Sequence, residues 1–393
     1  MRSINQSSTD YAKWLAGQLE GFGGLDLAVL GMKYERMRKE KPHTFLRATF
    51  YRWAERWREM ENGTPVVLSV GDVHVENFGT WRGKDGKLVW GINDADDACR
   101  LPWTSDVVRL GVSVCLALGD NAVAEAVPET ACDSVLAGYA AAMAAMAAPG
   151  AALVTEGHGV YRLVKEIILD ETLEDFWQDE DAKKQPAQNI PGSAVAVLTP
   201  ALPVTDAGLV FLEPKPAEPP GTGSMGKRRY YAAASIKGER LMREAKPAVP
   251  SGLAWAGGTS DDGSTAALLA STHRVPDPTQ QLDRGWIVRG LSRDAGKMKF
   301  KKLAEKKASP EELECLLQSM GRELAGLHRS GGDDNLRAAI LTDLETRATD
   351  GAWLRKLVAE QSALVKQDRA EFTLTIPPLP VAGEVQPMPA PSP

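Results

Sequence analysis

Cysteine and histidine are scarce in this chain of 393 residues, which holds four cysteines and five histidines. The cysteines show no Cys-x-x-Cys or other paired spacing, which argues against a zinc ribbon or a disulfide-stapled fold and fits a reducing compartment. Positive charge is also in the minority, since 46 Lys and Arg face 52 Asp and Glu for a net charge of −6. Such a mildly acidic chain is a poor candidate for a dedicated nucleic-acid or anionic-membrane binder.

Long apolar runs are missing as well. The longest run, residues 137–154, is mostly alanine and contains Gly138, Pro149 and Gly150, so it predicts a helix and its end and not a membrane span. The first residues are polar and carry no apolar block of the kind found in signal peptides. With 43% apolar and 25% charged residues, we expect a cytoplasmic globular enzyme of one large or two modest domains.

Helical and β-rich stretches alternate along the chain. Helical periodicity predicts helices over residues 10–62, 106–146, 310–329 and 334–370. Short β-rich runs occupy residues 65–70, 87–92, 209–212 and 285–289. Turn residues predict two hairpins, one joining 65–70 to 87–92 through residues 82–86 and one joining 230–236 to 240–246 through Lys237-Gly238. The pattern indicates an α+β protein.

The expected organisation is a two-lobed unit. We expect a helical lobe with a catalytic hairpin over residues 1–202, a β-rich lobe over 203–292, helices over 293–375 that complete the first lobe, and a Pro-rich disordered tail over 376–393. Four prolines between Pro214 and Pro220 mark a loop in the β-rich lobe or its boundary.

Acids and amides cluster after the first two β-rich runs. The string Gly71-Asp72-Val73-His74-Val75-Glu76-Asn77 follows the first run, and Asn93-Asp94-Ala95-Asp96-Asp97 follows the second. Crowded carboxylates repel one another unless a cation lies among them, so a divalent metal is the simplest explanation. The alternative is that these residues only build turns, in which Asp and Asn are common.

The spacing of these residues fits phosphoryl transfer, which needs a carboxylate at the attacking hydroxyl and oxygen ligands for Mg²⁺. Asp72 and Asn77 show the Asp-x₄-Asn spacing of the catalytic loop in kinase-like enzymes, and Asp94 follows after one hairpin, as their metal-binding Asp does. We predict Asp72 as the base and Asn77, Asp94 and Asp96 as the Mg²⁺ ligands. The string also resembles the HGDLHPxN…IDFDDA pattern of aminoglycoside phosphotransferases, which implies a structural role for Asp106.

A phosphate cradle is expected elsewhere, and residues 221–226 fit the G-x-G-x-x-G pattern. A predicted strand follows them where a dinucleotide-binding fold would have a helix, which favours a kinase-type Gly-rich hairpin; a flexible linker is the alternative. Lys246, in the next strand, would hold the α- and β-phosphates, with Arg243 as its rival. The predicted nucleotide-binding residues are Gly221, Gly223, Ser224, Gly226 and Lys246.

The order of these parts is unusual. In a kinase the Gly-rich hairpin and its lysine come first, and a helix then leads into the catalytic loop. Here the catalytic loop comes first, and the helix ending at Gly326-Leu327-His328 resembles the helix that precedes that loop in kinases. We therefore predict a circularly permuted kinase-like fold, in which residues 221–246 lie close to residues 72–94.

The chain also resembles a bacterial family called domain of unknown function 2252. The matching stretches are Phe45–Thr49, Gly71–Trp81, Trp90–Ala98, Gly221–Tyr230, Arg243–Lys246 with Ser251, Trp286–Arg289 and Met320–His328. The resemblance implies a kinase-like fold. The chain departs from the family pattern at Ala95, where the family has an aromatic residue, and residues 262–272 lack the helical glutamate that kinases pair with the strand lysine.

Other polar residues have competing interpretations. His74 could touch phosphate or metal, but such a residue is more often structural. Arg47 could reach an anion or form a salt bridge. Six lysines between Lys297 and Lys307 favour a solvated helix face.

Three functions remain open. The first is an ATP- and Mg²⁺-dependent phosphotransferase that acts on a small hydroxylated molecule, its identity not given by the sequence. The second is a catalytically impaired nucleotide-binding pseudokinase or regulator, suggested by Ala95 and the missing glutamate. The third is a metal-dependent phosphoesterase, because Gly71-Asp72-Val73-His74 resembles a GDxH metal motif; the remaining histidines lie outside the further strings that this chemistry needs.

Overall fold

Helices make up most of the described chain before residue 200 and after residue 300. The computed structural model of the protein describes residues 2–60, 63–121, 128–146, 152–203, 208–216, 221–257, 263–347 and 351–380. The helices are α1 (Ile4–Gln18), α2 (Leu27–Lys39), α3 (Pro42–Ala48), α4 (Phe50–Trp57), α5 (Trp103–Asn121), α6 (Pro128–Ala144), α7 (Tyr161–Leu163), α8 (Leu173–Ala182), α9 (Gly192–Leu198), α10 (Gly252–Gly257), α11 (Ser264–Leu269), α12 (Phe300–Glu305), α13 (Pro310–Ser330), α14 (Asp334–Thr346) and α15 (Ala352–Leu374).

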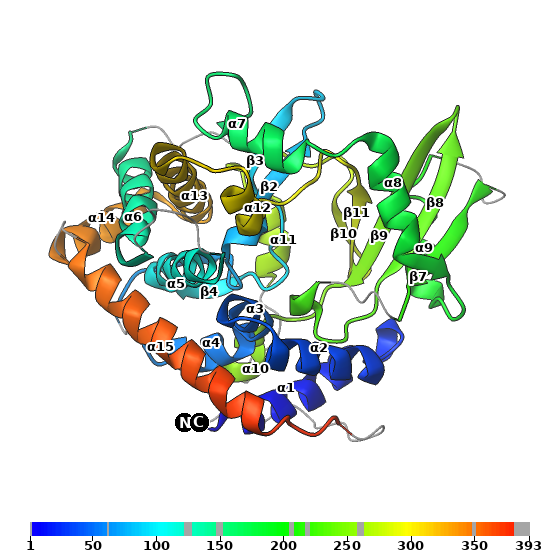
Figure 1. Cartoon of the computed structure of the whole chain (residues 1–393), viewed down its shortest axis with the longest axis horizontal. Helices are drawn as coiled ribbons and strands as arrows, with labels where there is room; N and C mark the ends of the chain where they lie inside the picture. The colour runs from blue at the N-terminus through cyan, green and yellow to red at the C-terminus, as the bar shows by residue number, and fades with distance from the viewer. Residues whose placement is uncertain are drawn as a thin grey trace.

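The strands of the described residues form three antiparallel sheets. They are β1 (Val66–Ser69), β2 (Phe78–Arg82), β3 (Leu88–Ile92), β4 (Cys99–Pro102), β5 (Ala152–Leu153), β6 (Lys184–Pro186), β7 (Val210–Pro214), β8 (Tyr230–Ile236), β9 (Glu239–Pro247), β10 (Gln281–Asp283) and β11 (Trp286–Leu291). The sheet orders are β10-β11-β9-β8-β7-β6, β2-β3-β5 and β1-β4. Figure 1 shows the largest sheet on one side of the molecule and helices α5, α6, α13 and α14 on the other.

This mixture of helices and antiparallel sheets is compatible with the expected α+β class. The helical stretch expected over 334–370 consists of two helices, α14 and α15, and the second begins after Gly351, which has the left-handed conformation (φ +71°). No helix of the described residues is both long enough and apolar enough to cross a membrane. The expected disordered tail falls mainly on residues 381–393, outside the described residues, as do the prolines at 219 and 220.

The first predicted hairpin has the wrong pairing. β1 pairs with β4, and the strand that pairs with β3 is β2. The predicted turn is present, because the amide of Gly83 donates to the carbonyl of Lys87 at 3.0 Å. A turn this short joins strands that are directly adjacent to it, so residues 78–82, which lie between the two predicted strands, form the partner strand.

The second predicted hairpin is confirmed. β8 and β9 pair from Tyr230↔Ala245 to Ile236↔Glu239. Lys237 and Gly238 both have positive φ, at 51° and 84°, as the two-residue turn of a twisted hairpin requires. The sheet also extends back to β6, which pairs with β7 and lies before the boundary expected at residue 203.

Helices α8 and α9 cover opposite faces of the large sheet. Side chains alternate between faces along a strand, so Tyr230 and Ala245 pack with Val197 of α9. Tyr231 and Met242 face the other way, where Trp177 of α8 packs against them. Because alternation continues along β9, Glu244 and Lys246 share the face of Met242, and this is the face that borders the candidate site.

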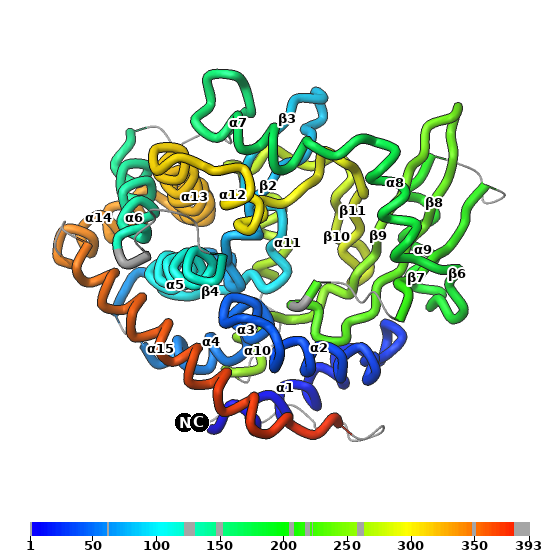
Figure 2. The backbone as a smooth tube through the Cα atoms, in the orientation of Figure 1, coloured from blue at the N-terminus to red at the C-terminus, as the bar shows by residue number. Residues whose placement is uncertain are grey.

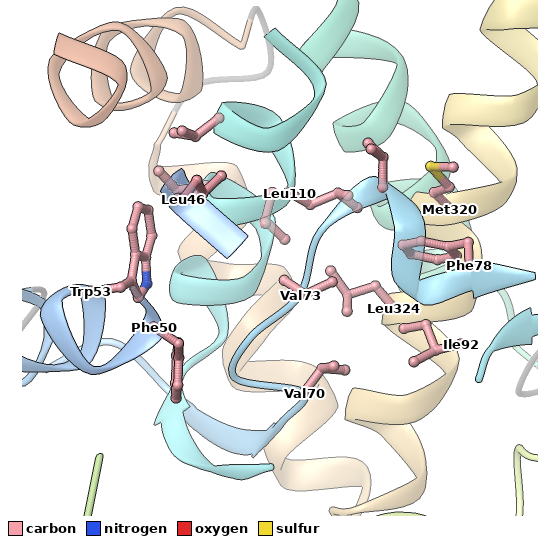
Figure 3. Close-up of a cluster of buried hydrophobic side chains, with 14 of the residues drawn as sticks. Leu46, Phe50, Trp53, Val70, Val73, Phe78, Ile92, Leu110, Met320 and Leu324 are labelled. Carbon is pink, nitrogen blue, oxygen red and sulfur yellow. The ribbon is translucent and has the colours of Figure 1, made fainter. Parts of the chain in front are cut away.

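The main core holds the segment between β1 and β2 in place. Val70 and Val73 of this segment are buried among Phe50 of α4, Leu110 of α5 and Leu324 of α13 (Figure 3). Figure 2 shows the β2–β3 hairpin beside the later segment that carries α12 and α13, and an isolated bridge pairs Gly79 with Lys297. The catalytic-loop candidate is therefore packed between helices that lie far apart in the sequence.

Candidate active site

A cavity of about 460 Å³ gathers nearly all of the residues that the sequence singled out. It lies where the segment between β1 and β4 meets the large sheet and residues 221–229. The described residues that line it are Arg47, Val70, Asp72, His74, Asn77, Asp94, Ala95, Asp96, Asp97, Lys183, Gly221, Gly223, Ser224, Lys227, Arg229, Lys246, Pro247, Arg289, Lys297 and Lys299. Eight of these are lysine or arginine and four are aspartate, so the lining has an excess of positive charge that suits an anionic ligand.

Asp72 lies directly after Gly71, whose positive φ of 75° turns the chain out of β1. The guanidinium of Arg109, a fully buried residue of α5, donates to Asp72 Oδ1. Burial nevertheless raises the pKa of Asp72 to about 7, with a smaller opposing effect from Arg109 and a reinforcing one from Asp97. A carboxylate with this pKa is suited to accepting a proton near neutral pH.

Asp106 anchors the backbone on which Asp72 sits. Its carboxyl group is completely buried and accepts hydrogen bonds from the amides of Val70 (2.7 Å) and Gly71 (3.2 Å) and from the Ser69 hydroxyl (2.5 Å). His328 Nε2, near the end of α13, lies 3.1 Å from the same carboxyl group. The structural role expected for Asp106 is thus visible as direct contacts with the backbone at Val70 and Gly71.

Asn77 and His74 shape the short 3₁₀ turn Val75–Asn77. The Asn77 Oδ1 atom accepts from the amide of His74 at 2.6 Å, and His74 Nδ1 accepts from the amide of Glu76 at 3.2 Å. The Asn77 side-chain amide also donates to the carbonyl oxygen of Asp94 at 3.4 Å. Asn77 therefore ties the turn to the acidic segment that follows β3, and His74 caps the turn.

Asp94 is the most strongly paired acid of the cavity. Lys246 Nζ lies 3.2 Å from its Oδ1 and Lys297 Nζ lies 2.9 Å from its Oδ2. Burial acts to raise the pKa of Asp94, but the two ammonium groups outweigh it and hold that pKa well below its usual range. Lys246 also lies 2.5 Å from Asp96 Oδ2. Residues of β9 and of the acidic segment after β3 are thus in direct contact.

Lysines 297–307 are not one solvated face, and the prediction for this run is wrong at its start. Lys297 and Lys299 precede α12 and line the cavity. Lys301, inside α12, has a side chain that is 82% exposed. The number of lysines does not reveal this difference. It arises because the backbone of Lys297 pairs with Gly79 before the helix begins.

The Gly-rich segment lies over Asp72. Residues Thr222–Ser224 form a 3₁₀ turn, and strand β8 begins only at Tyr230. The predicted Gly-rich hairpin is therefore not a tight turn but part of the long connection between the paired strands β7 and β8. A Cβ atom on Gly223 would lie 3.7 Å from Asp72 Oδ2 and 3.1 Å from the carbonyl oxygen of Arg47. A side chain at this position would be in van der Waals contact with the carboxylate and would press on the Arg47 carbonyl, so glycine keeps the turn close to Asp72.

The two ends of the Gly-rich segment are hydrogen-bonded to residues at the start of α2 and within it. Gly226 is not among the cavity-lining residues and instead accepts a hydrogen bond at its carbonyl from the amide of Asp26, at 3.0 Å. Lys33 of α2 is fully buried and donates to the carbonyl of Gly221 at 2.7 Å. Burial, aided by Arg36 and Arg229, lowers the pKa of Lys33 to about 7. The segment is therefore fastened to α2 at both ends.

A buried acid pairs with two arginines that line the cavity. Glu244 of β9 is 3% exposed and accepts from Arg229 Nη1 and from Arg289 Nε, each at 2.7 Å. Burial acts to raise the pKa of Glu244, but the two guanidinium groups hold it far below its usual range. Arg243, the rival of Lys246, lies on the opposite face of β9 and outside the cavity lining.

Arg109, Arg229, Arg289 and Lys33 were not proposed from the sequence. Arg229 carried a signal, because it closes the basic run Lys227-Arg228-Arg229 directly after the Gly-rich segment. Arg47 both lines the cavity and pairs with Glu76 at 2.8 Å, so its two interpretations are compatible. Among the described residues, no group of three or more His, Cys, Asp or Glu side chains is arranged to hold a metal ion.

Comparison with known proteins gives one family. The family described as an uncharacterized protein conserved in bacteria (DUF2252) matches residues 26–185. This match supports the family that the motifs indicated, and it includes the segment from Asp72 to Asp97 but ends before the Gly-rich segment and Lys246. No curated protein and no solved structure matches the chain significantly.

Proposed function

We propose that this protein is an ATP- and Mg²⁺-dependent phosphotransferase acting on a small hydroxylated molecule. One observation carries the proposal: Asp72, Asn77 and Asp94 share a cavity with the Gly-rich segment and Lys246, although these groups lie far apart in the sequence. Phosphoryl transfer is catalysed mainly by positioning and by stabilising charge, and these are the parts that it requires.

Each of these residues has a chemical role in the proposal. Asp72 would accept the proton of the acceptor hydroxyl as that oxygen bonds to the γ-phosphorus and the bond to the leaving diphosphate breaks. Lys246 would exchange its contact with Asp96 for contacts with the phosphates. Arg109 would keep the Asp72 carboxylate oriented, since it holds one oxygen and leaves the other toward the Gly-rich segment.

The donor set fits Mg²⁺. Mg²⁺ prefers oxygen ligands and is commonly held by one or two carboxylates together with substrate phosphates, so a preformed cage is not needed. Asp94 and Asn77 would supply the first protein ligands of the ion. Asp96 would become available as a further ligand once Lys246 leaves it to bind phosphate. The ion would neutralise charge on the phosphates.

The proposed fold is a permuted kinase-like one. Counting from β7, the Gly-rich connection joins the first and second strands and Lys246 lies on the third, as in protein kinases. His328, near the end of α13, lies against Asp106 and hence beside the start of the catalytic-loop segment, which supports the permuted order.

A second candidate is a nucleotide-binding protein without turnover. Lys246 is held by Asp94 and Asp96 and not by a helical glutamate, and Asp72 is already paired with Arg109. In this candidate, the charges of Asp72 and Lys246 stay paired with neighbouring protein groups, and a bound nucleotide would break these pairs without being turned over.

Turnover measurements separate the two candidates. The wild type and Asp72→Asn would be incubated with Mg²⁺-ATP and a panel of hydroxylated small molecules, and ADP release and phosphorylated products would be measured by mass spectrometry. We expect Asp72→Asn to lower turnover by about 10²- to 10⁴-fold while ligand-induced thermal stabilisation remains. Asp85→Asn, in the exposed turn between β2 and β3, is the matched control. Equal background turnover in all three proteins would reject the transferase for the acceptors tested.

A further inference from the structure

We infer that Lys33 of α2 is a positioning residue for the phosphates of the donor: it fixes the Gly-rich turn where that turn meets a polyphosphate, and it does so without contacting the ligand. This role rests on the proposed function, and it adds to the site a residue that does not line the cavity.

Lys33 reaches the Gly-rich turn from the side of α2. Gly221 and Gly223 line the cavity, and a Cβ atom on Gly221 would point into open space. Lys33 is fully buried, and its ammonium donates to the carbonyl oxygen of Gly221 at 2.7 Å. The side chain is therefore placed to act on the turn and not on a ligand in the cavity.

The carbonyl oxygen of Gly221 organises the turn. Besides Lys33 it accepts from the amide of Ser224 at 3.1 Å and from the hydroxyl of Ser224 at 2.9 Å. A hydrogen bond from an ammonium is stronger than one from a neutral donor, so Lys33 dominates the orientation of this peptide group. Ser224 is buried and lines the cavity, and its place depends on the same carbonyl oxygen.

The other end of the segment is fixed by different contacts. The amide of Asp26 donates to the carbonyl of Gly226 at 3.0 Å, and the carboxylate of Asp26 pairs with Arg228 at 3.3 Å. Met225 is buried in the main core. The half of the segment that faces the cavity is thus the half that Lys33 ties to α2.

A buried ammonium at this position is unfavourable for folding. Its partner is a carbonyl oxygen and not a carboxylate, and the nearby acid Glu40 pairs with Arg36 at 2.6 Å. Taking a charge out of water without an opposite charge destabilises the folded state. An apolar side chain such as methionine would fill the same space at lower cost, and residues that break such a rule concentrate at functional sites.

The charge of Lys33 is linked to the occupancy of the cavity. Burial is the largest cause that lowers the pKa of Lys33 to about 7, and Arg36, Arg229 and Arg47 lower it further while Glu40 opposes them. Arg229 and Arg47 line the cavity, so phosphates bound to them would offset their repulsion and favour the ammonium form. By reciprocity, the ammonium form favours phosphate binding.

Calorimetric titration of the full-length protein with inorganic tripolyphosphate and Mg²⁺ tests this role. Lys33→Met removes the ammonium and should raise the dissociation constant by about tenfold or more at pH 6. Lys39→Met is the matched control on the same helix, where the lysine side chain is 69% exposed, and should leave the constant unchanged. In urea unfolding, the midpoint of Lys33→Met should equal or exceed that of the wild type, because the Gly221 carbonyl keeps its Ser224 donors and the buried charge is gone.

The ratio of the two dissociation constants, Lys33→Met over wild type, is a readout that a merely structural role would not move. It should fall between about pH 6 and about pH 9, because only the wild type must then take up a proton at Lys33 on binding. The titrations of Asp72 and of tripolyphosphate are shared by both proteins.

Three results would each overturn the role of Lys33: equal dissociation constants, a ratio that does not change with pH, or an unfolding midpoint of Lys33→Met below that of the wild type. In all three the wild type still binds tripolyphosphate, so the proposed function stands. A wild type that does not bind tripolyphosphate would reject both.

Discussion

The contacts of Asp106 predict a large loss of stability in Asp106→Ala. The completely buried carboxyl group accepts from the amides of Val70 and Gly71 and from the hydroxyl of Ser69. Alanine leaves all three donors without this acceptor in a site that is closed to solvent. A buried donor that loses its partner costs about 1–3 kcal/mol, so the two amides and the hydroxyl together predict a loss of about 3–5 kcal/mol.

Urea unfolding followed by circular dichroism measures this loss. The midpoint should fall while the slope stays unchanged, because the surface exposed on unfolding is the same. Asp106→Asn keeps one acceptor oxygen and should lose only about 1–2 kcal/mol. Asp85→Ala is the control, since Asp85 is exposed and accepts from the Lys87 amide in a surface turn. A loss below about 1 kcal/mol in Asp106→Ala would refute the role assigned to this network.

Three further predictions concern the cavity. Because burial raises the pKa of Asp72 to about 7 and a base must be ionised, kcat/KM should rise with pH through about 7 and then level off; a flat profile from pH 5 to 9 would contradict this role. Gly223→Ala should weaken tripolyphosphate binding about three- to tenfold in calorimetric titration, because its Cβ would approach the Arg47 carbonyl to 3.1 Å, whereas Gly21→Ala, with open space around it, should not. Glu244→Ala leaves two arginines without their shared partner and should lower the free energy of unfolding, measured in urea, by about 3 kcal/mol. Because folding lowers the pKa of Glu244, the stability that this residue contributes is present above its unfolded pKa and is lost as the pH falls below that value. A difference between wild type and variant that persists unchanged at pH 2 would argue against the pairing.

Much of the local structure follows from short-range signals. The Lys237-Gly238 turn fixes its hairpin because both residues adopt positive φ. The spacing of Asp72 and Asn77 indicated that both belong to one loop after the first strand, and both residues line the same cavity. In both cases the decisive interactions lie within a few residues of one another.

The failures have a different physical origin. The pairing of β1 with β4 is set by packing around the whole segment between them, which no window of sequence contains. Lys297 looked like its neighbours in a lysine-rich run, and only the bridge to Gly79 places it beside Asp94. Arg109 lies in the middle of an apolar helix, where its pairing with Asp72 depends on the tertiary fold.

The meeting of residues 72–94 with residues 221–246 was predicted from motif order alone. The contact between Lys246 and Asp94, across 152 positions of the chain, is the structural counterpart of that prediction. The catalytic and metal-binding roles of Asp72, Asn77 and Asp94 stay predictions, which the experiments above test.

A crystal structure of the protein with Mg²⁺ and a non-hydrolysable triphosphate analogue tests the central claim most directly. The account predicts phosphates between Lys246 and the turn at residues 221–224, a metal ion at Asp94, and a Lys246 side chain that has left Asp96. Phosphates bound outside this cavity, or a cavity that stays closed by the Lys246–Asp94 and Lys246–Asp96 pairs while the ligand is bound, would contradict it.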